Sequence, residues 1–176
     1  LADHLAACDM STYLMGKTHM KPDIAGMNRL GIEPQSELGR FLSNAGFGQG
    51  EHDDGLHTVG VAGGYGTGTP AYFEYLRKHG YAAKNPWVTH ANAMQDEHGI
   101  LRNGMFLKYG HLPARVDKVH SETAYTTDRA IEMIQHMGPQ NWCLHVSYIK
   151  PHWPLAAPAP YHQMYRGMDL PQASKC

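Results

Sequence analysis

Two helix-then-strand patterns lie near the two ends of the chain. LADHLAAC, residues 1–8, has Leu1, Leu5 and Cys8 at helical spacing, and the β-rich STYLMG follows at 11–16. SETAYTTDRAIEMIQHMG, residues 121–138, predicts a second helix, and NWCLHVSYI at 141–149 predicts a buried strand. This order is typical of a parallel sheet with crossover helices, so we expect an α/β fold.

Capping residues and apolar spacing define three predicted helices. Ser121 caps the helix that ends at Gly138, Ser36 caps a short helix within PQSELGRFLSNAGF, and TPAYFEYLRKHG forms a third helix. The third helix has Thr69 as its cap, Pro70 in its first turn and Gly80 just past its end. The expected apolar faces are Leu38, Phe41 and Leu42 in the short helix and Ala124, Ile131 and Ile134 in the long one.

Glycine and proline mark the expected loops. Residues 17–33 are predicted as a loop, and the glycine-rich stretch 48–69 as a surface excursion. Within it, GGYGTGTP has the glycines of a phosphate loop but not the G-K-[ST] ending, which favours a flexible turn. Residues 81–119 fit strands or loops, and the four prolines in 150–165 predict an irregular segment.

Composition and charge restrict the functional classes. The 176 residues are 42% hydrophobic and 18% charged with a net charge of −1, so no basic field is present to attract nucleic acid or an anionic membrane. No apolar run approaches the roughly 20 residues needed to span a bilayer. We therefore expect neither nucleic acid nor a membrane as a partner.

The cysteines are odd in number and show no C-x-x-C pattern. Cys8, Cys143 and Cys176 are widely spaced, which argues against a disulfide framework and against a zinc knuckle. Cys8 and Cys143 lie in apolar segments and are predicted to be buried thiols. Unpaired cysteines favour a reducing interior, so we expect the cytoplasm rather than the periplasm.

Both predicted strands end in a lysine followed two positions later by a histidine. Lys17 and His19 follow the first strand, and Lys150 and His152 follow the second. Ligands of open parallel sheets collect outside the carboxyl ends of the strands. Two such strand ends would form a cationic pocket with proton donors and no carboxylate base. The lysines would neutralise an oxyanion and a histidine would protonate a leaving oxygen, which indicates phosphoryl or sulfuryl transfer. The alternatives are a solvated Lys-x-His pair and a rigid surface loop with His152 packed on Trp153.

The segment EHDDGLH offers a different chemistry. His52, Asp53, Asp54 and His57 lie close together in sequence and are residue types that bind metals. A histidine-rich metal-binding module is therefore one alternative function. His120 and His145 are interpreted as structural histidines.

The residues at the two strand ends resemble the sulfatase branch of the alkaline-phosphatase-like superfamily. YLMGKTHM is similar to its G-K-x-H motif, and SETAYTTDRAIEMI followed by CLHVSYIKPHWPLAAPAPYHQMY is similar to its helix, strand and proline-rich loop. The last stretch most resembles the phosphonate monoester hydrolase and arylsulfatase group. The resemblance covers about 1–20 and 120–166, whereas 21–119 matches loosely, as in a variable, loop-rich region near the substrate entrance.

The resemblance implies a hydrolase of sulfate, phosphate or phosphonate esters with a small anionic ester as substrate. Lys17 would contact the nucleophile and ester oxygens, His19 would steady the hydrated aldehyde, and His152 would help the leaving group depart. Lys150 is a candidate substrate-binding residue, although relatives vary there and a surface-facing lysine is the favoured interpretation. The implied fold is a partial alkaline-phosphatase-like fold, mainly a parallel sheet with flanking helices.

The chain departs from the family pattern at the nucleophile and the metal. No cysteine fits the C/S-x-P/A-x-R motif of the formylglycine nucleophile, because Cys8 precedes DMST and Cys143 precedes LHVS. The metal ligands, for calcium or manganese, are likewise expected outside the chain. We therefore interpret residues 1–176 as the central fragment of a single catalytic domain, inactive in isolation. A catalytically inactive family member is the remaining alternative.

Overall fold

The computed structural model describes residues 1–18, 23–33, 36–53, 55, 70–169 and 171–172. Its α-helices and strands are, in chain order, α1 (Ala2–Ala6), β1 (Ser11–Gly16), α2 (Ile24–Arg29), α3 (Glu37–Asn44), β2 (Gly48–His52), α4 (Ala71–Lys78), β3 (Ala93–Gln95), β4 (Leu101–Asn103), α5 (Glu122–Met137) and β5 (Trp142–Ser147). A π-helical turn spans Trp87–Ala91, and 3₁₀ turns span Leu107–Tyr109, Lys118–His120 and Tyr161–Gln163. The predicted mixed α/β class is confirmed.

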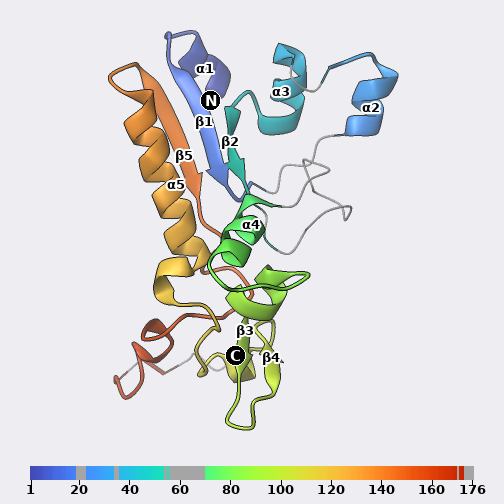
Figure 1. The fold of residues 1–176 in the computed structure, drawn as a ribbon. Helices are drawn as coiled ribbons and strands as arrows, with labels where there is room; N and C mark the ends of the chain where they lie inside the picture. Colours follow the sequence, from blue (N-terminus) through green and yellow to red (C-terminus); the bar gives the residue numbers. More distant parts are fainter. Residues whose placement is uncertain (19–22, 34–35, 54, 56–69, 170, 173–176) are drawn as a thin grey trace.

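Three strands form a parallel sheet in the order β2-β1-β5 (Figure 1). β1 pairs with β5 without interruption from Ser11↔Trp142 to Gly16↔Ser147. The predicted strand at 11–16 is confirmed, and the second predicted strand is shorter, from Trp142 to Ser147. β5 is half-buried rather than buried, because β1 is its neighbour on one side only within the described sheet. Helix α5 runs beside it (Figure 1).

The third strand, β2, lies where a surface excursion was predicted. Residues Gly48–His52 pair in parallel with β1, with Tyr13 opposite Gly48 and Gly16 opposite His52. A Cβ at Gly48 would lie 2.7 Å from the carbonyl oxygen of Thr12, so glycine permits this close pairing. The glycines that indicated a loop therefore allow β2 to pair closely with β1. The later part of that stretch, with GGYGTGTP, lies outside the described residues.

Helix α5 has the predicted ends but a different buried face. The Ser121 hydroxyl accepts a hydrogen bond from the Ala124 N–H at 3.3 Å, and Gly138 ends the helix at φ 62°. The buried residues are Glu122, Tyr125, Thr126 and Ala130. Ile131 and Ile134 are 47% and 43% exposed, so the predicted stripe is wrong. The buried face is chosen by tyrosine packing and by a polar network, which the aliphatic spacing does not reveal.

Helix α3 shows the same kind of difference. The Ser36 hydroxyl accepts a hydrogen bond from Gly39 N–H at 3.0 Å, which confirms the predicted cap. Gly39 and Ser43 are buried, whereas the predicted apolar face of Leu38, Phe41 and Leu42 is exposed. Small residues thus face the body of the molecule and allow the helix to approach it closely.

The main core lies between α4, the π-helical turn and α5. Its largest fully buried side chains are Trp87, Tyr72, Leu76, Met94 and Pro86. α4 begins after Pro70 and stops before Gly80, at φ 90°, as predicted, whereas Thr69 lies outside the described residues. His120 packs against this core, and its Nδ1 pairs with the Tyr75 hydroxyl at 2.8 Å.

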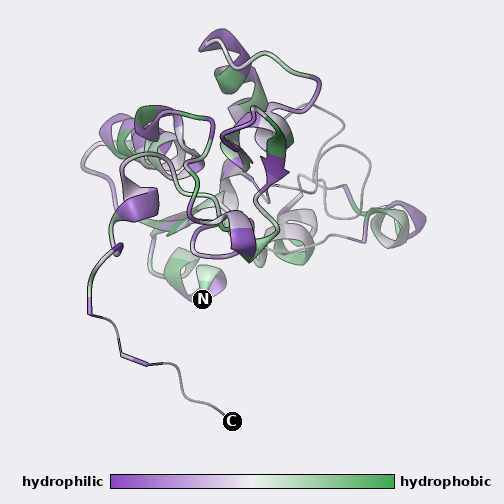
Figure 2. Ribbon diagram, turned by 90° about the horizontal axis from the view of Figure 1, so that it is seen from below, coloured by the Kyte–Doolittle hydropathy of each residue, from purple (hydrophilic) through white to green (hydrophobic). Residues whose placement is uncertain are grey.

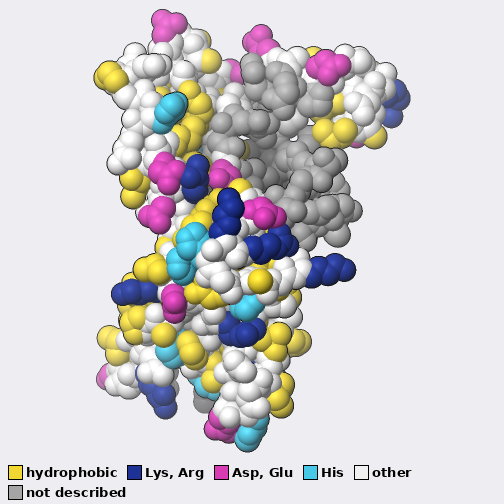
Figure 3. All heavy atoms as spheres, in the orientation of Figure 1, with side chains coloured by type: hydrophobic (Ala, Val, Ile, Leu, Met, Phe, Trp, Pro, Cys, Tyr) yellow, Lys and Arg dark blue, Asp and Glu magenta, His cyan; other side chains and the backbone are white. Residues whose placement is uncertain are grey.

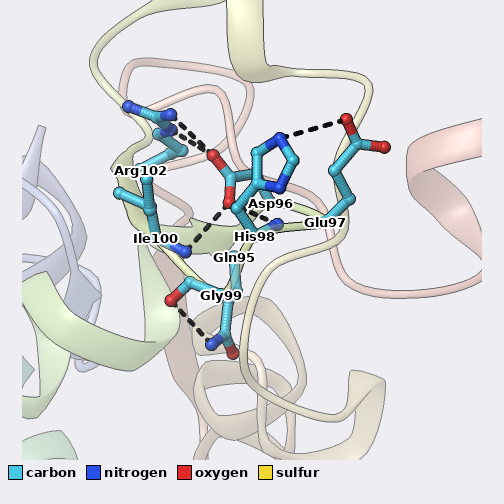
Figure 4. Close-up of polar contacts among 7 residues, drawn as sticks. All are labelled: Gln95, Asp96, Glu97, His98, Gly99, Ile100 and Arg102. Carbon is cyan, nitrogen blue, oxygen red and sulfur yellow. Dashed lines mark hydrogen bonds and ion pairs between the residues drawn. The ribbon is translucent and has the colours of Figure 1, made fainter.

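The region 81–119 contains an antiparallel hairpin of β3 and β4 whose turn is organised by Asp96 (Figure 4). Its carboxylate accepts hydrogen bonds from the N–H groups of His98 and Ile100, at 3.0 and 2.9 Å, and from Arg102 Nε at 2.7 Å. The Arg102 guanidinium also lies over the Tyr109 ring, 5.2 Å from its centroid. Arg102 thus connects the turn of the hairpin to the segment that contains Tyr109.

Other expectations are corrected by the structure. The predicted loop 17–33 contains α2, which begins where the Asp23 carboxylate accepts a hydrogen bond from Gly26 N–H at 2.9 Å. Cys8 is exposed and Cys143 is partly exposed, because Cys8 lies in the turn between α1 and β1 and Cys143 in the half-buried β5. His145 is an exposed residue of β5 rather than an interior one.

The surface is mixed in character. On the face drawn in Figure 3, Lys and Arg side chains alternate with Asp, Glu and His, without a field of one sign. The described residues near the C-terminus extend away from the rest of the chain, after the predicted irregular segment (Figure 2). Within the described part of the chain, no helix is both long and apolar enough to cross a bilayer.

Candidate active site

The carboxyl ends of the three parallel strands share one edge of the sheet. The Lys17 N–H donates to the carbonyl of Ser147 at 3.0 Å, so the pairing of β1 with β5 continues one residue past β1. On the other side, the Asp53 N–H donates to the Gly16 carbonyl at 3.1 Å. Gly16 adopts φ 86°, and a Cβ there would lie 2.0 Å from the Ser147 oxygen. Glycine is therefore required at the position that precedes Lys17.

Lys17 is half-buried at this edge, and its charge reaches the buried carboxyl of Glu122, whose pKa it lowers. Lys150 acts on the same carboxyl. Both lysines thus lie near one buried carboxyl group, which corrects the expectation of a cationic pocket without a carboxylate. His19 lies outside the described residues.

Lys150 does not face the surface, which corrects the favoured interpretation of this residue. Its ammonium donates to Asn92 Oδ1 at 2.7 Å and to the carbonyl of Pro154. Burial lowers the pKa of Lys150 to about 8, and the nearby Glu122 opposes this shift. The proline-rich loop folds back over the lysine, so a carbonyl four residues later becomes its partner.

Glu122 is the site residue that the sequence did not reveal. Only 6% exposed, it accepts a hydrogen bond from Trp87 Nε1 at 2.6 Å. Burial and the charge of Asp53 raise the pKa of Glu122 to about 8, against the opposing effects of Trp87, Lys150 and Lys17. An acidic residue directly after a helix cap is ordinary in sequence, so the pattern gave no signal of a buried carboxyl.

Asp53 is buried near the Glu122 carboxyl and is not part of a described metal centre. Its carboxylate accepts a hydrogen bond from the Gly55 N–H at 2.7 Å. Asp54 and His57, its predicted metal-binding companions, lie outside the described residues. Among the residues that the structure places, no group of three or more His, Cys, Asp or Glu has the arrangement of a metal site. The described donor set therefore does not fit a metal.

His152 is an exposed residue of the loop that follows β5. Its Nδ1 pairs with the carbonyl of Trp153 at 2.7 Å, and its N–H donates to the Ile149 carbonyl at 2.9 Å. Trp153 is 56% exposed. These contacts fix the start of the loop and orient the imidazole, and the leaving-group role of His152 stays a prediction.

Comparison with known proteins relates this geometry to a superfamily. No family model matches the chain. Over 59 residues it is 37% identical to the multifunctional alkaline phosphatase superfamily protein PehA of Trinickia caryophylli, an alignment that covers 34% of this chain and 12% of PehA.

Two solved structures share the fold. Phosphonate monoester hydrolase SpPMH from Silicibacter pomeroyi superposes with a TM-score of 0.70 and 23% identity over 99% of this chain. The phosphonate monoester hydrolase of Agrobacterium radiobacter superposes with a TM-score of 0.58 and 22% identity over 98%. The chain spans 30% and 29% of the lengths of these two structures. The resemblance seen in the motifs is confirmed: this chain is a partial match to the phosphonate monoester hydrolases of the alkaline phosphatase superfamily.

Proposed function

We propose that the chain forms part of the catalytic domain of a hydrolase that acts on sulfate, phosphate or phosphonate esters. The proposal is carried by the in-register parallel pairing of β1 with β5, which sets the loop of Lys17 beside the loop of Lys150 and His152. The names of the relatives, phosphonate monoester hydrolase and alkaline phosphatase superfamily protein, support this class of reaction. We also propose that the described sheet is part of a larger, mainly parallel sheet.

Lys17 is the proposed partner of the ester oxyanion. It follows a strand whose last residue is fixed by pairing on both sides, so its backbone position is well defined. A positioned ammonium stabilises the negative charge that develops on the equatorial oxygens in the transition state. His19, two residues further on, is proposed to act on the covalent intermediate.

His152 is the proposed proton donor to the departing alkoxide. The hydrogen bonds of its N–H and Nδ1 anchor the ring at the start of the proline-rich loop. Proton transfer to a leaving oxygen matters most when that oxygen is strongly basic. The requirement for this residue should therefore depend on the leaving group.

Lys150 is proposed to position the loop rather than to bind substrate or to face the surface, the two roles considered from the sequence. Two of its three ammonium protons are already used by Asn92 and Pro154. Because the contact with Asn92 ties the loop to the end of the π-helical turn, Lys150 would determine the position of His152. The proposed formylglycine nucleophile and divalent metal, calcium or manganese, are assigned to no residue of this chain.

The proposal is tested by assaying the full-length protein on aryl sulfate, phosphate and phosphonate esters. Turnover of at least one ester is expected, and Lys17→Ala should lower kcat/KM by about 100-fold or more, since one oxyanion partner is worth roughly that much. Lys84→Ala, at an exposed position, is the matched control and should retain activity. Equal activity of Lys17→Ala and the parent protein would refute the oxyanion role.

A further inference from the structure

A pocket of about 560 Å³ lies between the first turn of α5, the end of the π-helical turn and the loop after β5. In Figure 1 the first turn of α5 and this loop run side by side near the lower end of the sheet. The pocket walls are largely apolar and include Val116, Leu155, Ala156 and Pro158. Its volume is within the range of small-molecule sites.

Two buried polar side chains line the same pocket, and each has an atom without a hydrogen-bond partner among the described residues. Asn92 is 2% exposed and Glu122 is 6% exposed. Asn92 uses Oδ1 for Lys150 and Glu122 uses Oε1 for Trp87, which leaves Asn92 Nδ2 and Glu122 Oε2. Leaving a buried polar atom unpaired costs about 1–3 kcal/mol, so native proteins rarely do so without a reason.

The groups around the pocket favour a ligand without net charge. A cation would meet the ammonium of Lys150, whereas an anion would lose its hydration against apolar walls. The Lys150 ammonium is also already engaged with Asn92 and Pro154. A neutral ligand avoids both penalties.

We propose that this pocket binds an uncharged alcohol with a flat apolar body, of which phenol is the simplest representative. A hydroxyl both donates and accepts, so it can pair with the free amide N–H of Asn92 or the free oxygen of Glu122. Proline rings and Tyr161 offer flat surfaces to an aromatic body. This inference goes beyond the proposed hydrolysis and does not depend on it.

Two ligands of nearly equal size and shape test the polar end of the pocket. Phenol and toluene are titrated into the full chain at pH 7 and followed by protein-observed NMR. Phenol should bind saturably, with a Kd on the order of 1 mM for a ligand of this size. Toluene, which lacks the hydroxyl, should bind about fivefold or more weakly, since a hydrogen bond is worth about 1 kcal/mol. Toluene binding as tightly as phenol would overturn the assignment of the polar partners.

A matched pair of variants tests the location. Ala124 lines the pocket in the first turn of α5, so Ala124→Leu fills part of it with a good helix former. Gln135→Leu adds a leucine to an exposed position of the same helix, away from the pocket lining. Phenol affinity should fall about tenfold or more in Ala124→Leu and stay unchanged in Gln135→Leu, with near-UV circular dichroism confirming that both are folded. Unchanged affinity in folded Ala124→Leu, or no saturable binding to the parent chain, would refute the proposal.

Discussion

Single residues at the strand edge form a buried group of opposite charges. Asp53, Lys150 and Lys17 all act on the buried carboxyl of Glu122, in an environment that opposes ionisation of Glu122 and Lys150. Each also has neutral hydrogen-bond partners: Asn92 and the Pro154 carbonyl for Lys150, and Trp87 for Glu122. The contribution of such a group to the free energy of unfolding depends strongly on pH, because the folded and unfolded states hold different numbers of protons.

Glu122→Gln tests this dependence. The pKa of Glu122 is raised from 4.5 to about 8 in the folded protein. As the pH rises between these values, the unfolded chain releases a proton that the folded protein retains, so the contribution of Glu122 to stability falls. The free energy of unfolding of the parent protein, relative to Glu122→Gln, should therefore decline from pH 5 to pH 8. Each tenfold difference in proton affinity corresponds to about 1.4 kcal/mol.

Urea unfolding of both proteins across this pH range is the measurement. Parallel pH profiles would contradict the raised pKa and the burial that causes it.

Lys150→Met tests the anchoring of the loop. The variant keeps the apolar stem but leaves Asn92 Oδ1 and the Pro154 carbonyl without their donor. We expect a loss of about 1–3 kcal/mol in the free energy of unfolding, from urea denaturation of the intact protein. Lys84→Met, at an exposed position, should change it by less than about 0.5 kcal/mol. The same small change in both variants would rule out a structural role for the Lys150 ammonium.

The residue-level chemistry was only partly readable from the sequence. The neighbouring positions of the Lys17 and Lys150 loops could be predicted because each loop follows a strand, and adjoining parallel strands bring their ends together. Glu122 and Asn92 could not, because their burial arises from packing between α5, the π-helical turn and the loop after β5. No local pattern encodes that contact.

Among the elements, β1 depends on a glycine at its end. A Cβ at Gly16 would lie 2.0 Å from the Ser147 oxygen, and the residue has φ 86°. Gly16→Ala should therefore lower the free energy of unfolding by about 3 kcal/mol or more. Gly31→Ala, at φ 66° with no atom within 4 Å, isolates the backbone strain and should cost about 1–2 kcal/mol. If chemical denaturation gave equal losses in both, the close approach of β1 to β5 would be wrong.

The β3–β4 hairpin depends on the carboxylate of Asp96. In Asp96→Ala the N–H groups of His98 and Ile100 lose their acceptor (Figure 4). Amide hydrogen exchange at these two positions should accelerate about tenfold or more, because the turn opens locally. Glu97→Ala is the control, since the Glu97 carboxylate lies 3.6 Å from exposed His98 Nε2 and holds no backbone group. Unaltered exchange in Asp96→Ala would refute the role of this turn.

Element boundaries were predicted better than element faces. β1, the Ser121 and Ser36 caps and the glycine stops follow from local chemistry, which the sequence carries directly. The buried faces predicted for α3 and α5 were wrong, because aliphatic residues point outward and small or polar residues point inward. β2 was missed because its glycines, a loop signal, allow strand contact instead.

For the whole molecule, the fold matches about 30% of the length of two phosphonate monoester hydrolases. The α/β class and the resemblance to the alkaline phosphatase superfamily were predictable, since two motif-bearing strand ends at the two ends of the chain carry this resemblance. The arrangement of 81–119 was not predictable, because short turns there derive their structure from contacts with the core.

The loops of Lys17 and His152 are proposed to act on one ester, and this convergence can be measured. It is tested most directly by kcat/KM for a series of esters with leaving groups of increasing basicity, in the full-length protein and in His152→Ala. If His152 protonates the leaving oxygen, the variant should lose most with poor leaving groups and little with activated aryl esters, which gives a steeper dependence on leaving-group pKa. An equal loss across the whole series would refute proton donation by His152 to the leaving group.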